Sequence, residues 1–299
     1  MSNLLKNCKL CPRNCNVNRL NGTVGFCNST DAVKVALVSL HYWEEPCVSG
    51  TNGSGTVFFS NCNLRCVFCQ NYKISAEGSG KEISINRLSE IFLEHQERGA
   101  HNINLVTPTH YVPQIIKALD SAKSNGLSIP ILFNTNGYEN IDTIRSLKGY
   151  IDVYLPDLKY FHSKYSNKYS YVPDYFDKAS EAIQEMFLQV QEPKFDTNGL
   201  IKKGLIIRHM MLPGLLFDSK KVIDYIYKTY GDSVYISIMN QYTPMHNAKL
   251  FSEINKSLNP KHYGSLIDYC LYLGIKNAFI QADGTSSESF VPDFNLRGI

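Results

Sequence analysis

Residues 56–71 read TVFFSNCNLRCVFCQN and join a strand pattern to a cysteine motif. The run 56–60 is rich in β-branched and aromatic residues, which is typical of a buried strand. Cys62, Cys66 and Cys69 follow it directly, with the spacing C-x3-C-x2-C. Parallel α/β proteins carry their active sites in the loops at the carboxyl ends of the strands. This stretch therefore predicts both the start of the fold and the place of a site.

The rest of the chain alternates strand patterns with helical patterns. Strands are predicted at 56–60, 102–106, 129–134, 152–155, 205–209 and 234–239. Apolar stripes of helical period lie between them, most clearly within 112–122, 176–190 and 222–230. Six successive strand–helix units indicate parallel strands with helical crossovers. We predict an α/β fold, a partial (β/α)6 TIM-like barrel, with a doubly wound sheet as the alternative.

Length and composition indicate one large globular unit. The chain has 299 residues, 43% hydrophobic and 19% charged, and we predict a cysteine-rich N-terminal segment (1–50) before the barrel (51–299). A net charge of +3 without a basic run argues against nucleic acid as a partner. The sequence has no apolar run of about 18 residues and no signal-peptide pattern at its start, so we expect a cytoplasmic protein without a membrane span.

Eight of the nine cysteines lie in the first quarter of the chain. In a reducing compartment, clustered cysteines bind metal more often than they form disulfides. Cys270 is the exception, because it lies in an apolar helical pattern and is predicted to be a buried core thiol.

The loop of Cys62, Cys66 and Cys69 suits an iron–sulfur cluster. Three closely spaced thiolates can ligate three irons of a [4Fe–4S] cube and leave the fourth iron open. An open coordination position is what distinguishes a catalytic metal site from a structural one. A chelating ligand with amino and carboxylate groups can occupy that position.

This loop resembles the signature of the radical S-adenosylmethionine (SAM) superfamily. Phe68, just before the last cysteine, matches the aromatic residue that packs near the adenine in that family. The resemblance implies that a reduced cluster cleaves SAM to methionine and a 5′-deoxyadenosyl radical, which abstracts hydrogen from the substrate. It also implies an electron donor such as flavodoxin or ferredoxin.

Further positions resemble the activating enzymes of glycyl-radical enzymes. Asn134 and Asn136 lie in a polar turn like the one near SAM in those enzymes, and Asp157 and Lys159 match an Asp-x-Lys element. His209, in an Arg-His pair, matches their fifth-strand segment. The resemblance implies that these five residues contact SAM.

The whole chain is most similar to the pyruvate formate-lyase activating enzyme-like branch (PflX type). It departs from true activases in two features. A Gly-Gly-Glu segment that holds the amino group of SAM is replaced by Val-Thr-Pro-Thr at 106–109, where Thr107 is the candidate for contact with SAM. The chain also carries an N-terminal four-cysteine segment that simple activases lack.

That segment contains Cys8, Cys11, Cys15 and Cys27, with the spacing C-x2-C-x3-C-x11-C. So short a stretch with few apolar residues cannot form a core of its own, which indicates that a metal organises it. Zinc and a second iron–sulfur cluster both suit four thiolates.

The stretch 41–47, HYWEEPC, holds Trp43, Glu44, Glu45 and Cys47. We expect Trp43 to dock the N-terminal segment onto the barrel. The two carboxylates and the thiol either line a substrate cavity or lie in solvent and core, and the sequence favours neither.

Three functions fit these patterns. The first is a radical SAM enzyme acting on a protein or small molecule. The second is an electron-transfer protein, which would ligate every iron with cysteine and need no barrel. The third is a binding module in which Cys62, Cys66 and Cys69 hold zinc. The barrel and the open iron favour the first.

Overall fold

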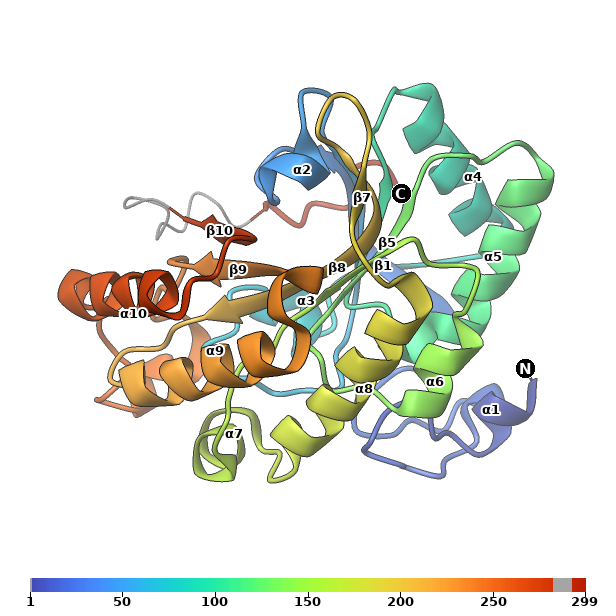
Figure 1. The fold of residues 1–299 in the computed structure, drawn as a ribbon. Coiled ribbons are helices and arrows are strands. Elements are labelled where there is room, and N and C mark those ends of the chain that lie inside the picture. Colours follow the sequence, from blue (N-terminus) through green and yellow to red (C-terminus); the bar gives the residue numbers. More distant parts are fainter. Residues whose placement is uncertain (1, 282–291) are drawn as a thin grey trace.

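The computed structural model describes residues 2–281 and 292–299 and confirms all six predicted strands (Figure 1). They are β2 (Ser54–Phe59), β4 (Ile103–Val106), β5 (Ile131–Thr135), β6 (Val153–Pro156), β8 (Ile201–Met210) and β9 (Tyr235–Met239). Each is parallel to the next, and they lie side by side in chain order.

This strand order identifies the architecture. The sheet runs β10-β9-β8-β6-β5-β4-β2-β1-β3, with β7 paired to β8. A doubly wound sheet reverses its strand order at a switch point. The six parallel strands described here follow one another without such a reversal, so the partial barrel is confirmed and the doubly wound alternative is wrong.

Four strands were not predicted from the sequence. They are β1 (Val33–His41), β3 (Lys81–Ile83), β7 (Lys194–Phe195) and β10 (Ala278–Ile280). The last extends the parallel set beside β9. The β1 strand pairs antiparallel with both β2 and β3, so β1 and β3 extend the sheet on its other side.

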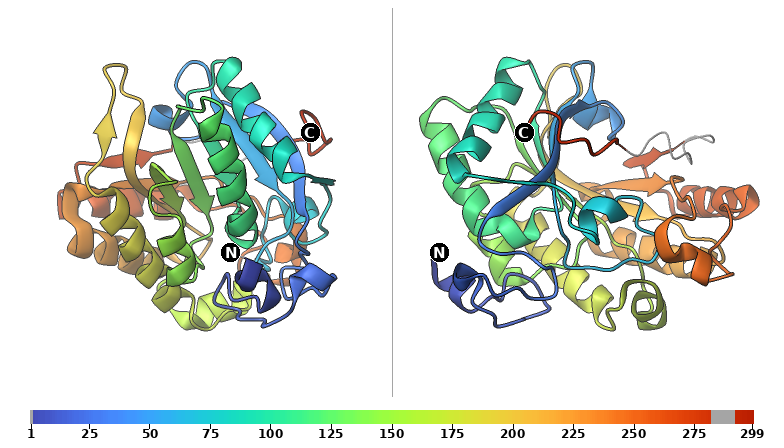
Figure 2. Two further views of the ribbon diagram at one scale, coloured as in Figure 1. Left: turned by 90° about the vertical axis from the view of Figure 1, so that its right-hand side faces the viewer. Right: turned by 180° about the vertical axis from the view of Figure 1, so that it is seen from behind.

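The longer helices cover the outer side of the sheet (Figure 2). The ten α-helices of the described residues are α1 (Ser2–Lys6), α2 (Pro46–Ser49), α3 (Tyr72–Ser75), α4 (Ile85–Glu97), α5 (Val112–Ser124), α6 (Ile141–Ser146), α7 (Ser163–Ser170), α8 (Tyr175–Val190), α9 (Leu216–Tyr230) and α10 (Pro260–Leu273). The predicted stripes form the buried faces of α5, α8 and α9. Their packing against the strands forms the main core.

The α5 helix illustrates how local sequence sets these boundaries. Pro113 lies in its first turn, where the missing N–H costs nothing. Gly126 follows its end with φ at 95°, a left-handed conformation that favours glycine.

The β1 strand brings the stretch after it to the amino-terminal end of the barrel. His41, its last residue, pairs with Ser54, the first residue of β2. The α2 helix therefore lies at the end of the sheet opposite α7 and the N-terminal segment (Figure 1). Glu44 and Glu45 enter the barrel from this end.

The cysteine-rich segment packs at the carboxyl ends of the strands, below the barrel in both views of Figure 2. Apart from α1 and a 3-10 turn (Arg19–Asn21) it is irregular up to β1. Arg19 anchors it: the side chain is fully buried and donates hydrogen bonds to the carbonyl oxygens of Thr30 at 3.1 Å and His110 at 2.6 Å. The division of the chain at residue 50 stays a prediction, and within its first part β1 joins the sheet.

No helix in the described part of the chain has both the length and the apolar character needed to span a bilayer.

Candidate active site

The three predicted cluster cysteines line one cavity of about 470 Å³ inside the barrel. Cys62, Cys66 and Cys69 lie in the loop that follows β2, at its carboxyl end. The cavity continues past polar residues of β5 and β8 and of the loop after β6 to the stretch before α2. The carboxyl ends of parallel strands meet at one edge of a sheet, which is why residues distant in sequence converge here.

Burial determines the chemistry of the three thiols. It raises the pKa of Cys62 to about 12 and that of Cys69 to about 11. Burial also raises the pKa of Cys66, although Lys159 opposes this shift. Such thiols stay protonated at neutral pH unless a cation binds them, and a coordinated metal deprotonates its thiol ligand outright. The site therefore suits a metal centre better than a free nucleophile.

Polar groups from distant elements stabilise the sulfurs. Asn136 Nδ2, in the loop after β5, donates to Cys62 Sγ at 3.3 Å. Ser170 Oγ, at the end of α7, donates to Cys66 Sγ at 3.0 Å. Hydrogen bonds to cysteine sulfur favour thiolate charge and tune the reduction potential of iron–sulfur clusters.

A cluster and a single metal ion make different demands on three thiols. Across the described ranges, no three His, Cys, Asp or Glu side chains converge as ligands of one metal ion. A zinc site needs its ligands about 2.0–2.3 Å from one point. A cubane instead offers a separate iron to each of three thiolates. Cys62, Cys66 and Cys69 line the same cavity, which is compatible with the cluster.

A charged network occupies the middle of the cavity. Asp157 Oδ2 lies 2.5 Å from Lys159 Nζ, and its Oδ1 accepts from Arg208 Nε at 3.0 Å. Burial opposes ionisation of Asp157, but Lys159 and Arg208 outweigh it and lower the pKa of this carboxyl. Asp157 is thus an ionised, oriented acceptor facing the cavity.

Arg208 links this network to the amino-terminal end of the barrel. Its Nη2 donates to Asn134 Oδ1 at 2.6 Å, and its Nη1 lies 3.3 Å from Glu44 Oε2. Glu44 Oε1 in turn accepts from Asn134 Nδ2 at 3.2 Å and from Asn104 Nδ2 at 3.1 Å. The sequence left Glu44 undecided between cavity and solvent, and the structure places it in the cavity.

Six of the seven predicted SAM contacts line this cavity: Phe68, Thr107, Asn134, Asn136, Asp157 and Lys159. His209 does not. Its Nδ1 is bonded to the Leu158 carbonyl oxygen at 2.7 Å and its Nε2 to Ser219 Oγ at 2.9 Å. Both ring nitrogens are therefore engaged away from the cavity.

Strand geometry explains why the expectation for His209 fails. Successive side chains of a strand point to opposite faces, so His209 and Arg208 cannot both face inward. Arg208 and Met210 line the cavity instead. Arg208 was not predicted as a site residue. The only indication of its role in the sequence is its position beside His209 in the Arg-His pair.

Thr107 has an unusual backbone conformation. Its φ is 56°, in the left-handed region that β-branched residues rarely adopt. Its N–H donates to the Asn134 carbonyl oxygen at 2.9 Å, which continues the contact between β4 and β5 past the end of the strand. Strained backbone of this kind concentrates at functional sites.

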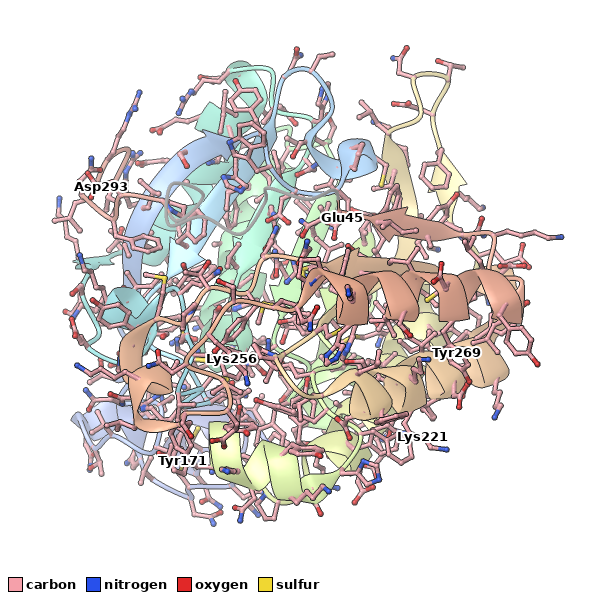
Figure 3. All side chains as sticks on the ribbon, turned by 90° about the vertical axis from the view of Figure 1, so that its left-hand side faces the viewer. Glu45, Tyr171, Lys221, Lys256, Tyr269 and Asp293 are labelled. Carbon is pink, nitrogen blue, oxygen red and sulfur yellow. The ribbon has the colours of Figure 1, made fainter. Side chains whose placement is uncertain are left out.

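Glu45 also lines the cavity and is only 8% exposed (labelled in Figure 3). Trp43 lines the cavity as well, although it is 65% exposed. Cys47 lies in the core beside Val48, and burial raises the pKa of its thiol to about 12. Cys270 is buried on α10, as predicted.

The N-terminal cysteines do not surround a single point in this structure. Cys11 lies within electrostatic reach of Cys15 and Cys27, and burial raises the pKa of its thiol strongly. Cys8 Sγ instead lies 4.0 Å from Arg19 Nη1. Among the described residues, the four thiols are thus not arranged as the ligands of one metal ion.

The N-terminal segment contacts the three-cysteine loop directly. Arg13 and Arg65 both pack on the ring of Phe26, with the guanidinium carbons 3.6 and 4.9 Å from its centre. Arg65 donates to the carbonyl oxygen of Cys62 at 2.7 Å, and Arg13 to that of Asn63 at 3.1 Å. Phe26, the residue before Cys27, is thereby connected through Arg13 and Arg65 to the loop that carries Cys62.

Comparison with known proteins agrees with this geometry. The family model of the radical SAM superfamily matches residues 56–190. The uncharacterized protein MJ0674 of Methanocaldococcus jannaschii is 31% identical over 266 residues, which cover 86% of this chain and 72% of that protein. The family-model match includes the three-cysteine loop and the strands β2, β4, β5 and β6.

Two solved structures share the fold. SuiB of Streptococcus suis, bound to precursor peptide SuiA, superposes with a TM-score of 0.51 and 16% identity over 75% of this chain. Methylornithine synthase (PylB) gives a TM-score of 0.53 and 15% identity over 74% of this chain. The chain spans 47% of the SuiB chain and 61% of the PylB chain.

A partial barrel with three cysteines after its first parallel strand defines a class of iron–sulfur protein. The chain belongs to the radical SAM superfamily. This family uses a [4Fe–4S] cluster and SAM.

Proposed function

We propose that Cys62, Cys66 and Cys69 ligate three irons of a [4Fe–4S] cluster whose fourth iron binds SAM. The observation that carries the proposal is the one cavity that these thiols share with six predicted SAM contacts. When bound, the cluster and SAM supply a 5′-deoxyadenosyl radical, which abstracts hydrogen from a protein or small-molecule substrate. A flavodoxin or ferredoxin would supply the electron.

The protein's own residues would position SAM and exclude water. Asp157 is held ionised between Lys159 and Arg208, so it can accept hydrogen bonds from hydroxyl or ammonium groups without reorganising. Phe68 packs near Tyr242, with ring centres 6.0 Å apart, and offers an apolar face to a purine. Met239 lines the wall near β9 and helps keep water from a reactive radical.

Reductive cleavage of SAM tests the proposal directly. Protein reconstituted without oxygen, and given dithionite or a flavodoxin system, should release 5′-deoxyadenosine and methionine even without the true substrate. Asp157→Ala and Asn134→Ala should lower the yield at unchanged iron content, because both are placed beside SAM and not on iron. The exposed Asp268→Ala is the matched control.

The possible results separate the functions. No 5′-deoxyadenosine above a cluster-free control, with several reductants tried, would favour the electron-transfer function. A normal yield from both pocket variants would retain the enzyme class and refute the placement of SAM.

We also propose that the chain belongs to the activase-like (PflX-type) branch. Asn134 and Asp157 support this, since they lie in the two segments that resemble those of activases and both line the cavity. Glycyl-radical formation in a partner protein, measured by electron paramagnetic resonance, would establish this role.

The four N-terminal cysteines are proposed as a second metal site. Cys11 lies within electrostatic reach of Cys15 and Cys27, and binding of zinc or iron would bring the four thiols together. Metal analysis of four single Cys→Ser variants is the test. Equal losses of metal would support one four-thiolate site, and four normal contents would refute it.

A further inference from the structure

The charged side chains that line the cavity do not balance. Among the described residues, three carboxylates, those of Glu44, Glu45 and Asp157, face two cationic side chains, Lys159 and Arg208. The ion pairs of the two cations go to the other two carboxylates: Lys159 pairs with Asp157, and Arg208 pairs with Asp157 and Glu44. Within the described ranges, no ion pair includes Glu45.

Glu45 is a buried carboxylate with one oxygen unused. Ser237 of β9 hydrogen-bonds to the carboxyl group, but Oε2 has no hydrogen-bond partner among the described residues. Burial raises the pKa of Glu45, Arg208 lowers it, and Glu44 raises it again, with a net upward shift. An unpaired buried carboxylate is costly, and a bound cation removes that cost.

The place of Glu45 separates it from the cluster. It caps α2 at the amino-terminal end of the barrel, whereas Cys62 follows the carboxyl end of β2. The six residues of β2 lie between these ends and span roughly 16 Å at about 3.3 Å per residue. SAM held at the three thiols would lie toward the carboxyl end of the cavity, whereas the Glu45 side chain reaches inward as far as Ser237 of β9.

A second hollow of about 510 Å³ adjoins the stretch before α2 and is also lined by Gln241 and Gln281, which follow the carboxyl ends of β9 and β10. It shares Trp43, Glu44 and Pro46 with the main cavity. A molecule bound between SAM and Glu45 would therefore have space at its charged end.

We propose that Glu45 anchors a cationic group of the substrate, an ammonium or guanidinium, and so presents the rest of the molecule to the radical at the thiol end of the cavity. This inference rests on the proposed function, since it assigns the substrate class of the same site. The neutral, apolar part of the substrate would lie along Phe58, Met210 and Met239.

The test measures binding and needs no turnover. Reconstituted protein with saturating SAM is titrated with n-hexylammonium and, separately, with 1-hexanol, a neutral probe of the same size. The wild type should bind the ammonium at least about tenfold more tightly, which is the scale of a hydrogen bond to a charged group. Glu45→Gln should lose this preference while keeping its affinity for hexanol and SAM and its iron content.

The exposed Glu97→Gln is the matched control and should behave as wild type. If Glu45→Gln fails to fold, Glu45→Asp serves in its place. It keeps the charge on a shorter side chain and should retain only part of the preference.

Three outcomes would overturn the inference: equal binding of both probes by the wild type, an undiminished preference in Glu45→Gln, or a loss of SAM affinity in that variant, which would assign Glu45 to SAM. A protein that cleaves SAM but shows no preference loses only this inference. A protein that prefers the ammonium but never cleaves SAM refutes the proposed function, and with it the assignment of Glu45 to a substrate.

Discussion

Glu139 gives a quantitative test of the electrostatics beneath the cavity. This residue follows β5 and is 1% exposed. Its Oε1 accepts from Thr109 Oγ1 at 2.6 Å and also from Thr135 Oγ1, while Oε2 has no partner among the described residues. Burial raises the pKa of Glu139 to about 7 even though the two hydroxyls oppose the shift. The folded protein therefore holds a proton that the unfolded chain releases.

The size and sign of the effect follow from linkage. The ordinary pKa of this carboxyl is 4.5. Raising it to about 7 costs about 3 kcal/mol of folding free energy once the group is ionised, at about 1.4 kcal/mol per pH unit. The folded state binds more protons than the unfolded state between these two values, so stability falls as the pH rises from 4.5 to 7 and then levels off. About 2.5 kcal/mol of the change lies between pH 5 and pH 8.

Glu139→Gln isolates this contribution because glutamine does not titrate. We predict that the free energy of unfolding of the variant, relative to wild type, improves by about 2.5 kcal/mol between pH 5 and pH 8. Urea titrations without oxygen at several pH values measure it, with the exposed Glu97→Gln as control. If the free energies of unfolding of variant and wild type differ by the same amount across this pH range, the raised pKa of Glu139 is refuted. If the difference changes in the other direction, the pKa of Glu139 is lowered and not raised.

Three further substitutions probe backbone and packing. Thr107→Gly should stabilise the protein by about 1 kcal/mol, seen as a higher urea midpoint, because glycine adopts a φ of 56° without strain; a lower midpoint would contradict this. Gly25→Ala should lower the free energy of unfolding by about 1–3 kcal/mol and reduce the N-terminal metal content, because the new Cβ would lie 2.7 Å from Cys15 Sγ. An unchanged metal content would argue against that contact. Phe26→Ala should lower the free energy of unfolding by about 1–2 kcal/mol and speed cluster loss in air, because Arg65 would no longer pack on an aromatic ring. Cluster loss at the wild-type rate would show that the N-terminal segment does not support the three-cysteine loop.

The six central strands were predictable because each is buried on both faces. Such strands are near-continuous apolar runs, as in β5, where Ile131, Leu132 and Phe133 are at most 1% exposed. The β10 strand has only three residues, too few for a pattern. The β1 strand pairs antiparallel with its successor, and a local pattern does not show which partner a strand will find.

The candidate site was predictable where its residues follow strands in the chain. Cys62 and Asp157 are of this kind. His209 was wrong by one residue, because the sequence does not show which face of β8 turns inward. Glu44 meets Arg208 across 164 positions, and no short-range signal can report such a contact. The sequence shows which residue types are present, but it does not show which of them the tertiary structure brings together in the cavity.

The central claim is that Cys62, Cys66 and Cys69 hold a cluster with an iron open to SAM. Electron paramagnetic resonance of the reduced, reconstituted protein tests it most directly. We predict a [4Fe–4S] signal that shifts when SAM is added. The shift should be abolished when all three cysteines are replaced by alanine, whether or not the N-terminal cysteines hold a cluster of their own, and it should persist in Cys270→Ala. A SAM-dependent shift that remains in the triple variant would contradict the claim.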